Sequence, residues 1–279
     1  MNKLGLGIVA FDDTLHLRNI TSEIRDLCDI IVVCLQKESY HGVPIDIRIE
    51  SDICKLKDEG LVDDVIWFTP SVEYDLSKPE APRIMETDKR NFIIDFLSEN
   101  GCDYAHVIDS DEFYDHDDYQ NAKNILIEHP DINVTYCEYI NYYRDYRHLL
   151  VWPFKSYVPF ISKVSYKFDF FNGSFDKPSD PTRRYLIEGK DAKYCIMSFS
   201  TVKMHHLSWI RTDIREKLKN WSAKKYFDDD DELVEKVIER YENYEDGQNA
   251  FLLFNVPEYR VVVNKLSESY IHPKYPLVS

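Results

Sequence analysis

Short apolar runs alternate with amphipathic segments through the first 110 residues of the chain. Four apolar runs predict buried strands, at residues 4–11, 29–35, 65–68 and 104–108. Three intervening segments carry apolar residues at helical spacing and predict helices, at residues 17–27, 44–60 and 82–100. Gly60 and Gly101 follow two of these helices and are typical helix-ending residues. Strands that alternate with helices in this way predict a mainly parallel sheet flanked by helices, an α/β fold.

The pattern changes after residue 115. A further series of elements is predicted: a helix at 117–128, a strand at 132–140, strands and loops at 141–175, a polar loop at 178–184, a strand at 194–204, helices at 210–227, 230–244 and 247–254, and a strand at 260–264. No internal repeat and no linker is evident, so we expect a single domain over residues 1–279.

Composition limits the classes of protein to consider. The formal net charge of −16 argues against a nucleic-acid partner, because nonspecific nucleic-acid binders need a basic surface. The six cysteines have neither metal-ligand spacing nor a Cys-x-x-Cys pair, so we expect buried free thiols and a reducing compartment. No signal-peptide pattern and no apolar run long enough for a membrane span is present, so we expect a cytoplasmic protein.

The strongest chemical signal is Asp109-Ser110-Asp111, directly after the fourth predicted strand. Two carboxylates at a strand end can converge on Mg²⁺ or Mn²⁺, which prefer oxygen ligands and leave positions for substrate phosphates. Ligands of open α/β sheets also bind beyond the carboxyl ends of the strands. The alternative is that these carboxylates only cap the next helix. The three strand–helix units that come first favour a metal–diphosphate site.

Two later groups of residues extend this site. His205 and His206 lie at the predicted end of a strand, just before a helix, and one of them could supply an imidazole ligand to the cation. Only one can face the cation, since adjacent strand residues point to opposite faces. Arg211 and Arg215 begin a basic face of the following helix, which would stabilise a diphosphate. The alternatives are a hydrogen-bonded structural histidine and an ordinary solvated surface.

At this point a family resemblance becomes clear. The segments Lys89-Arg-Asn91, Gly101-Cys-Asp-Tyr104 and Val107-Ile-Asp-Ser-Asp-Glu-Phe113 resemble the core of family-two-like GT-A glycosyltransferases, and His206-Leu-Ser-Trp209 resembles their later H-x-S-[WYF] element. The resemblance covers residues 4–225 in the order of elements. It implies a Rossmann-like GT-A domain in which residues 1–115 bind a nucleotide sugar and residues 116–279 form the acceptor half and C-terminal helices.

The same resemblance implies a nucleotide-sugar donor, Mn²⁺ or Mg²⁺, and roles for individual residues. The implied metal ligands are Asp109, Asp111 and His206. The implied donor-binding residues are Ala10, Phe11, Asp12, Arg90, Asp109, Ser110, Arg211 and Lys217. The chain lacks the Glu-Asp pair that such enzymes carry in the acceptor half. Asp111 is the implied catalytic residue at the metal. The general base stays open among Glu138, Asp145, Asp169, Asp176, Asp180 and Asp191, of which Glu138 and Asp191 are put forward.

We therefore expect a metal-dependent glycosyltransferase, a hexosyl- or pentosyltransferase. It would move a sugar from a nucleoside-diphosphate donor, most simply UDP-linked, to a hydroxyl of a glycan, a lipid-linked glycan or another macromolecule. One alternative is a sugar-nucleotide nucleotidyltransferase, which should carry a glycine-rich loop after the first strand, whereas Phe11-Asp-Asp-Thr14 has no glycine. The other is a catalytically inactive GT-A-like binding subunit.

Overall fold

The computed structural model describes residues 3–70, 74–75, 77–151, 155–187, 192–211, 213–220, 231–245, 249–251 and 261–265. The first half consists of β1 (Leu4–Val9), α1 (Leu17–Ile24), the 3₁₀ turn η1 (Arg25–Leu27), β2 (Ile30–Leu35), α2 (Ile47–Asp58), β3 (Asp64–Trp67), α3 (Ala81–Glu99) and β4 (Tyr104–Asp109). The second half consists of β5 (Glu112–Phe113), α4 (His116–Glu128), β6 (Val134–Tyr143), β7 (Asp145–Val151), β8 (Tyr157–Lys163), the 3₁₀ turn η2 (Pro181–Arg183), β9 (Tyr194–Ile196), β10 (Lys203–Trp209), α5 (Ile214–Asn220), α6 (Asp231–Glu242), β11 (Asn249–Phe251) and β12 (Val261–Lys265).

These strands form one mixed sheet with the order β11-β12-β7-β6-β8-β4-β1-β2-β3, to which β5, β9 and β10 pair off the main path. The strands β3, β2, β1 and β4 are parallel, as the strand–helix pattern predicts. On the other side of β4, the strands β8, β6, β7 and β12 follow along the path, and each runs antiparallel to the strand before it. The prediction of a mainly parallel sheet therefore holds for the first half alone. No crossover helix separates β6 from β7, so a tight turn joins them as an antiparallel pair.

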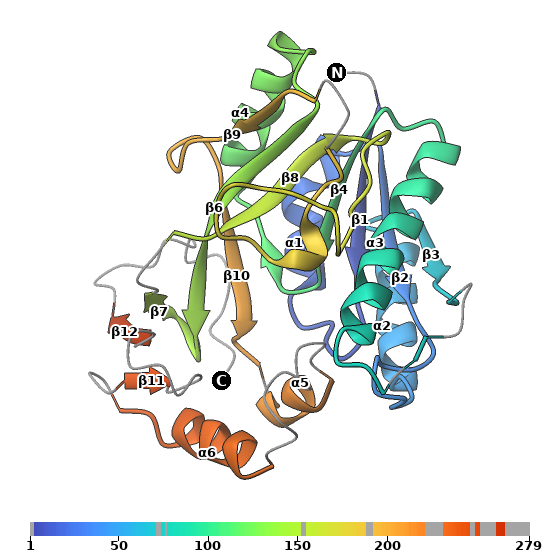
Figure 1. Ribbon diagram of the computed structural model, residues 1–279. Coiled ribbons are helices and arrows are strands. Elements are labelled where there is room, and N and C mark those ends of the chain that lie inside the picture. The colour runs from blue at the N-terminus through green and yellow to red at the C-terminus, as the bar shows by residue number, and fades with distance from the viewer. Residues whose placement is uncertain are drawn as a thin grey trace.

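Helices cover both faces of the parallel strands. Buried residues of α1, α2 and α4 join one hydrophobic cluster with Leu4, Leu6 and Ile8 of β1. Buried residues of α3 join a second cluster with Val32 and Cys34 of β2. Figure 1 shows α3 in front of these strands and α1 behind them. The result is a three-layer α/β arrangement with the carboxyl ends of the parallel strands left open.

The close packing of α3 against β1 depends on two glycines of β1. Gly5 and Gly7 point toward α3, on the face opposite Leu4 and Leu6. A Cβ atom on Gly7 would lie 2.0 Å from Cγ2 of Ile93, and one on Gly5 would lie 2.5 Å from Cδ2 of Leu97. The missing side chains therefore let α3 pack directly against the strand.

Three predicted elements in the second half are wrong in their bounds or type. The strand predicted at 194–204 is split into β9 and β10, because Ser198 forms a polar turn with hydrogen bonds to Ser200 and Thr201. The helix predicted from residue 210 begins at Ile214, and residues 221–227 lie outside the described part of the chain. Within the helix predicted at 247–254, residues 249–251 form β11 instead, since β12 pairs with them. Local periodicity did not reveal this pairing.

The helices α5 and α6 lie below β10 in Figure 1. They form a separate cluster in which Tyr143 and Trp209 both contact Tyr241 of α6. The hydroxyl of Tyr241 donates a hydrogen bond to the backbone oxygen of Trp209 at 2.8 Å. This cluster holds the end of β10 against the C-terminal helices. Within the described residues, no helix is both long and apolar enough to span a membrane.

The close packing at Gly7 predicts the effect of one added methyl group. Gly7→Ala should lower the free energy of unfolding by about 1–3 kcal/mol, because the new Cβ overlaps Ile93. Urea denaturation measures this change. In the double variant Gly7→Ala/Ile93→Ala the loss should be smaller than the sum of the two single losses. Additive losses would show that the strand does not contact α3 as closely as described.

Candidate functional site

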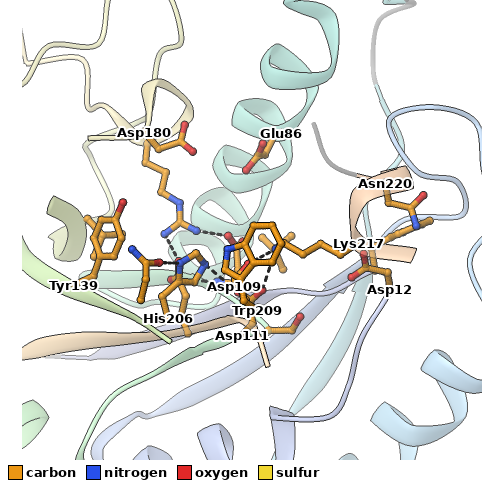
Figure 2. Close-up of a pocket in the computed structure, with 18 of the residues that line it drawn as sticks. Asp12, Glu86, Asp109, Asp111, Tyr139, Asp180, His206, Trp209, Lys217 and Asn220 are labelled. Atoms are coloured by element: carbon orange, nitrogen blue, oxygen red, sulfur yellow. Dashed lines mark hydrogen bonds and ion pairs between the residues drawn. The ribbon is translucent and has the colours of Figure 1, made fainter. Parts of the chain in front are cut away.

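A pocket of about 620 Å³ lies at the carboxyl ends of β1, β2 and β4. Its lining includes Asp109, the last residue of β4, and Ser110 and Asp111, which follow it. The lining also includes residues of α3, β5, β6, β7, β8, β10 and α5 and of the turn η2. Figure 2 shows these side chains converging from opposite sides on the two aspartates. The position agrees with the rule that open α/β sheets bind ligands beyond their strand ends.

Asp109 is held by two arginines. Nη2 of Arg90, on α3, lies 2.8 Å from Oδ1 and 3.0 Å from Oδ2 of Asp109. Arg183, at the end of η2, forms a second ion pair with Oδ2. Burial alone would raise the pKa of Asp109, but Arg183 and Arg90 outweigh it and hold this pKa below its ordinary value. Asp109 is therefore an ionised carboxylate with both oxygens engaged.

Asp111 faces a different set of partners. Nη2 of Arg211 donates to Oδ2 of Asp111 at 2.9 Å, and Nη1 of Arg211 donates to Oδ1 of Asp12 at 2.9 Å. Nζ of Lys217 lies 3.9 Å from the same Oδ2. Burial opposes ionisation of Asp111, but the charges of Lys217 and Arg211 outweigh it and hold its pKa far below the ordinary value. The other oxygen, Oδ1, points toward Nε2 of His206 at 3.7 Å.

The two histidines of β10 have different surroundings. His205 is buried, and its Nδ1 lies 2.9 Å from the hydroxyl of Tyr142. His206 lines the pocket, and its Nδ1 lies 2.6 Å from Oδ1 of Asn141. Burial lowers the pKa of His206 to about 4, so the ring is neutral near neutral pH. They lie within β10 rather than at its end, because the strand continues to Trp209.

The Asp111–His206 pair fits a divalent cation. A neutral imidazole whose Nδ1 donates to the Asn141 carbonyl presents the lone pair of Nε2, which is the usual arrangement of a metal-binding histidine. That lone pair and Oδ1 of Asp111 face each other across 3.7 Å, close enough for one ion to contact both. Among the described residues, no three His, Cys, Asp or Glu side chains are grouped to hold a metal. The three-ligand set with Asp109 therefore stays a prediction.

Sequence reasoning missed the roles of Glu112 and Arg183. Nη1 of Arg183 lies 2.6 Å from Oε1 of Glu112, whose side chain is 2% exposed. Burial, together with the charge of Asp109, raises the pKa of Glu112 to about 7 although Arg183 opposes this shift. Arg183 thus joins η2 to both Asp109 and Glu112. The chain between β8 and β9 carries no pattern that would select this arginine among its neighbours.

The other predicted site residues are distributed as follows. Phe11, Asp12, Ser110, Arg211 and Lys217 line the pocket. Ala10 is buried beneath it, and its backbone oxygen lies 3.5 Å from Nζ of Lys89. Lys217 donates to the hydroxyl of Ser208, and its Nζ lies 5.9 Å from the ring centroid of Trp209.

Arg215 of the predicted cationic helix face and Glu138, a candidate general base, lie outside the pocket lining. Arg215 pairs with Glu235 on the outer surface and does not line the pocket, unlike Arg211. Glu138 is not part of the pocket lining and pairs with the exposed Lys155. Asp191 lies outside the described residues.

Two side-chain amides of the pocket also carry unsatisfied oxygens. Gln36 donates from Nε2 to the backbone oxygen of Glu38 at 2.7 Å, and Asn220 donates from Nδ2 to that of Glu216 at 3.1 Å. These bonds fix the orientation of each amide: its nitrogen faces the backbone oxygen, and its own oxygen points the other way. Oε1 of Gln36 and Oδ1 of Asn220 are buried and have no partner among the described residues. An unpaired buried acceptor is costly, so both oxygens are candidates for ligand contact.

No protein-family model and no curated protein sequence matches the chain. A crystal structure of S. aureus TarS residues 1–349 is similar at 10% identity and a TM-score of 0.43, over 78% of this chain and 62% of that one. A crystal structure of S. aureus TarS is similar at 12% identity and a TM-score of 0.35, over 50% of this chain and 22% of that one. Likeness of this extent identifies neither a family nor an activity.

The buried Glu112 predicts a specific dependence of stability on pH. Its pKa is raised from 4.5 to about 7 in the folded protein, so its stabilising contribution is full below pH 4.5 and lost as the pH rises to about 7. Relative to Glu112→Gln, the wild-type protein should therefore lose free energy of unfolding over this interval. Urea denaturation of both proteins at several pH values measures the difference. Parallel pH curves would contradict the burial of an ionisable Glu112.

Proposed function

We propose that this protein is a metal-dependent glycosyltransferase that moves a sugar from a nucleoside-diphosphate sugar to a hydroxyl group. The main support is the grouping at the ends of parallel strands of a cation-binding pair, Asp111 and His206, with two cations, Arg211 and Lys217. Cations and a metal ion are the groups that stabilise the charge developing on a departing diphosphate. The residues also match the D-x-D and H-x-S-W elements of the sequence resemblance.

In this proposal the donor spans the pocket from β2 to β10. The nucleoside would lie near Phe11 and Asp12, beside Oε1 of Gln36, which supplies an unpaired acceptor for an N–H group of the base. Uracil offers such a group at N3, which is consistent with a UDP-linked donor. Ser110 would lie below the ribose or the diphosphate. Arg90 would act indirectly, by holding Asp109 ionised and oriented.

The diphosphate would lie between Asp111 and α5. Arg211 and Lys217 are buried or nearly so, and a cation in such surroundings interacts strongly with phosphate oxygens. His206, oriented by Asn141, and Asp111 would hold Mn²⁺ or Mg²⁺ beside the diphosphate. When bound, such an ion neutralises the charge that develops on the departing diphosphate. The acceptor would be a glycan, a lipid-linked glycan or another hydroxyl compound, and a cytoplasmic location remains part of the proposal.

The alternatives predict different products. A glycosyltransferase releases a nucleoside diphosphate from a nucleotide sugar. A sugar-nucleotide nucleotidyltransferase consumes a nucleoside triphosphate and a sugar phosphate and releases pyrophosphate. An inactive binding subunit releases neither. Incubation with UDP-glucose or UDP-N-acetylglucosamine, and in parallel with UTP and glucose 1-phosphate, followed by measurement of UDP and of pyrophosphate, therefore separates the three functions.

Donor binding should depend on a divalent cation. UDP should raise the melting temperature in the presence of Mn²⁺ and much less in the presence of EDTA, because Asp111 and His206 contact the diphosphate through the ion. At about a hundredfold excess over the dissociation constant, the stabilisation should reach about 2.7 kcal/mol. Thermal-shift measurements test this, with Asp111→Asn as the variant that loses the Mn²⁺-dependent part. Equal shifts with Mn²⁺ and EDTA would exclude the metal-dependent site.

The two adjacent histidines offer a matched pair of variants. His206→Ala should weaken Mn²⁺-dependent UDP binding at least tenfold, in the range that loss of a metal-ligand contact produces, with little change in melting temperature. His205→Ala should lower the melting temperature, because it removes a buried contact with Tyr142, and should leave the affinity for UDP nearly unchanged. Titration calorimetry and thermal unfolding measure the two effects. The reverse pattern would assign the ligand to His205.

A further inference from the structure

Six carboxylates line the pocket, and five of them are paired with arginine. The paired residues are Asp12, Glu86, Asp109, Asp111 and Glu112. Asp180 differs, because it has no ion-pair partner among the described residues. A carboxylate held by a guanidinium has an oxygen already engaged at contact distance and is less available to a substrate hydroxyl. Asp180 is therefore the pocket carboxylate, among the described residues, that is exposed and keeps one oxygen outside any ion pair or hydrogen bond, where an acceptor hydroxyl can reach it.

The position of Asp180 is fixed by its own turn. Oδ1 accepts hydrogen bonds from the backbone N of Thr182 at 2.9 Å and from its hydroxyl at 3.0 Å. Oδ2 has no partner among the described residues. Three residues later, Arg183 anchors the same turn to Asp109 and Glu112. One oxygen of Asp180 thus orients the carboxylate, and the other is free on a turn that is tied to the centre of the site.

The surroundings of Asp180 are those of an open subsite. Its side chain is exposed, and the half-buried Tyr139 and Tyr157 line the same pocket. Tyr157 donates from its backbone N to the oxygen of Pro178 at 2.9 Å, which places β8 beside the chain that carries Asp180. The ring of Tyr139 lies edge-on to that of His206, with 5.9 Å between centroids. Figure 2 shows Asp180 and Tyr139 on one side of the two central aspartates, and Asp12 and Asn220 on the other.

We propose that Asp180 is the catalytic base that accepts the proton of the acceptor hydroxyl. The proposal rests on the proposed glycosyltransferase function and assigns the subsite between Tyr139, Tyr157 and Asp180 to the acceptor. The acceptor oxygen forms a bond to the anomeric carbon of the sugar as its proton passes to Oδ2 of Asp180. The bond between that carbon and the phosphate oxygen breaks, and its electron pair leaves with the nucleoside diphosphate. Direct displacement of this kind inverts the anomeric configuration.

The same subsite indicates the class of acceptor. Tyrosine presents an apolar ring face and a hydroxyl group, and two tyrosines beside a carboxylate suit a molecule that has both C–H faces and several hydroxyls. A carbohydrate or another polyol has this chemistry. The negative charge of Asp180 disfavours an acceptor whose reacting end carries a phosphate, since like charges repel at close range.

Asp180→Asn tests the assignment with little structural change. Asparagine keeps an oxygen that can accept both bonds from Thr182, so the turn is preserved and only the free oxygen is replaced. UDP release from UDP-glucose and UDP-N-acetylglucosamine is measured with Mn²⁺, with water and glycerol as the acceptors. We expect kcat to fall about 10²- to 10⁴-fold, the usual contribution of a general base. KM for the donor and the melting shift produced by UDP should stay within about twofold, because Asp180 does not contact the donor in this arrangement.

Asp176→Asn is the matched control. Asp176 lies in the same loop, is exposed, does not line the pocket and pairs with Lys177. Its kcat should equal that of the wild-type protein. A kcat for Asp180→Asn within twofold of the wild-type value, or an equal loss in both variants, would overturn the assignment of the base. Absence of UDP release and of any UDP-induced melting shift in the wild-type protein would instead overturn the proposed function itself.

Discussion

The site depends on the neutralisation of three carboxylates that crowd the end of β4. Asp109, Asp111 and Glu112 lie within four residues of one another; Asp111 and Glu112 are buried, and Asp109 is partly buried. Such a cluster is stable only with opposite charges at contact distance, because burial of unpaired charge is very costly. Arg90, Arg183 and Arg211 supply them from three distant parts of the chain. The ion pairs therefore join the parallel half of the sheet to the second half.

This balance also bears on what the pocket can bind. The lining contains six carboxylates and five basic side chains, and His206 is neutral near neutral pH. A pocket that is so nearly neutral gives a diphosphate little net attraction. A divalent ion at Asp111 and His206 would supply the missing positive charge, and Arg211 and Lys217 would then contact the phosphate oxygens. The charge count thus supports the metal-dependent form of the proposed reaction independently of the motif.

The parts of the structure that sequence predicted are those that local patterns determine. The four parallel strands, the helices between them and the turns at Gly60 and Gly101 follow from periodicity and from the positive φ of the two glycines. The position of Asp109 and Asp111 at a strand end follows in the same way. The pairing of β5 with β10 and the contact of Arg183 with Glu112 depend on which distant segments meet. No local signal in the sequence distinguishes these partners. For the same reason, the sequence left the general base undecided among its six candidate carboxylates.

One short segment of α3 shows how closely the two halves are connected. Nζ of Lys89 lies near the backbone oxygen of Ala10 after β1, and Arg90 holds Asp109 after β4. Asn91 donates to the backbone oxygen of Phe168 at 2.8 Å and accepts from its backbone N at 2.9 Å. Three consecutive residues thus fix the end of the first strand, the central carboxylate and the chain that leads to η2. A helix that Gly5 and Gly7 allow to lie directly on β1 therefore sets the distance between the strand ends that line the pocket and Asp180.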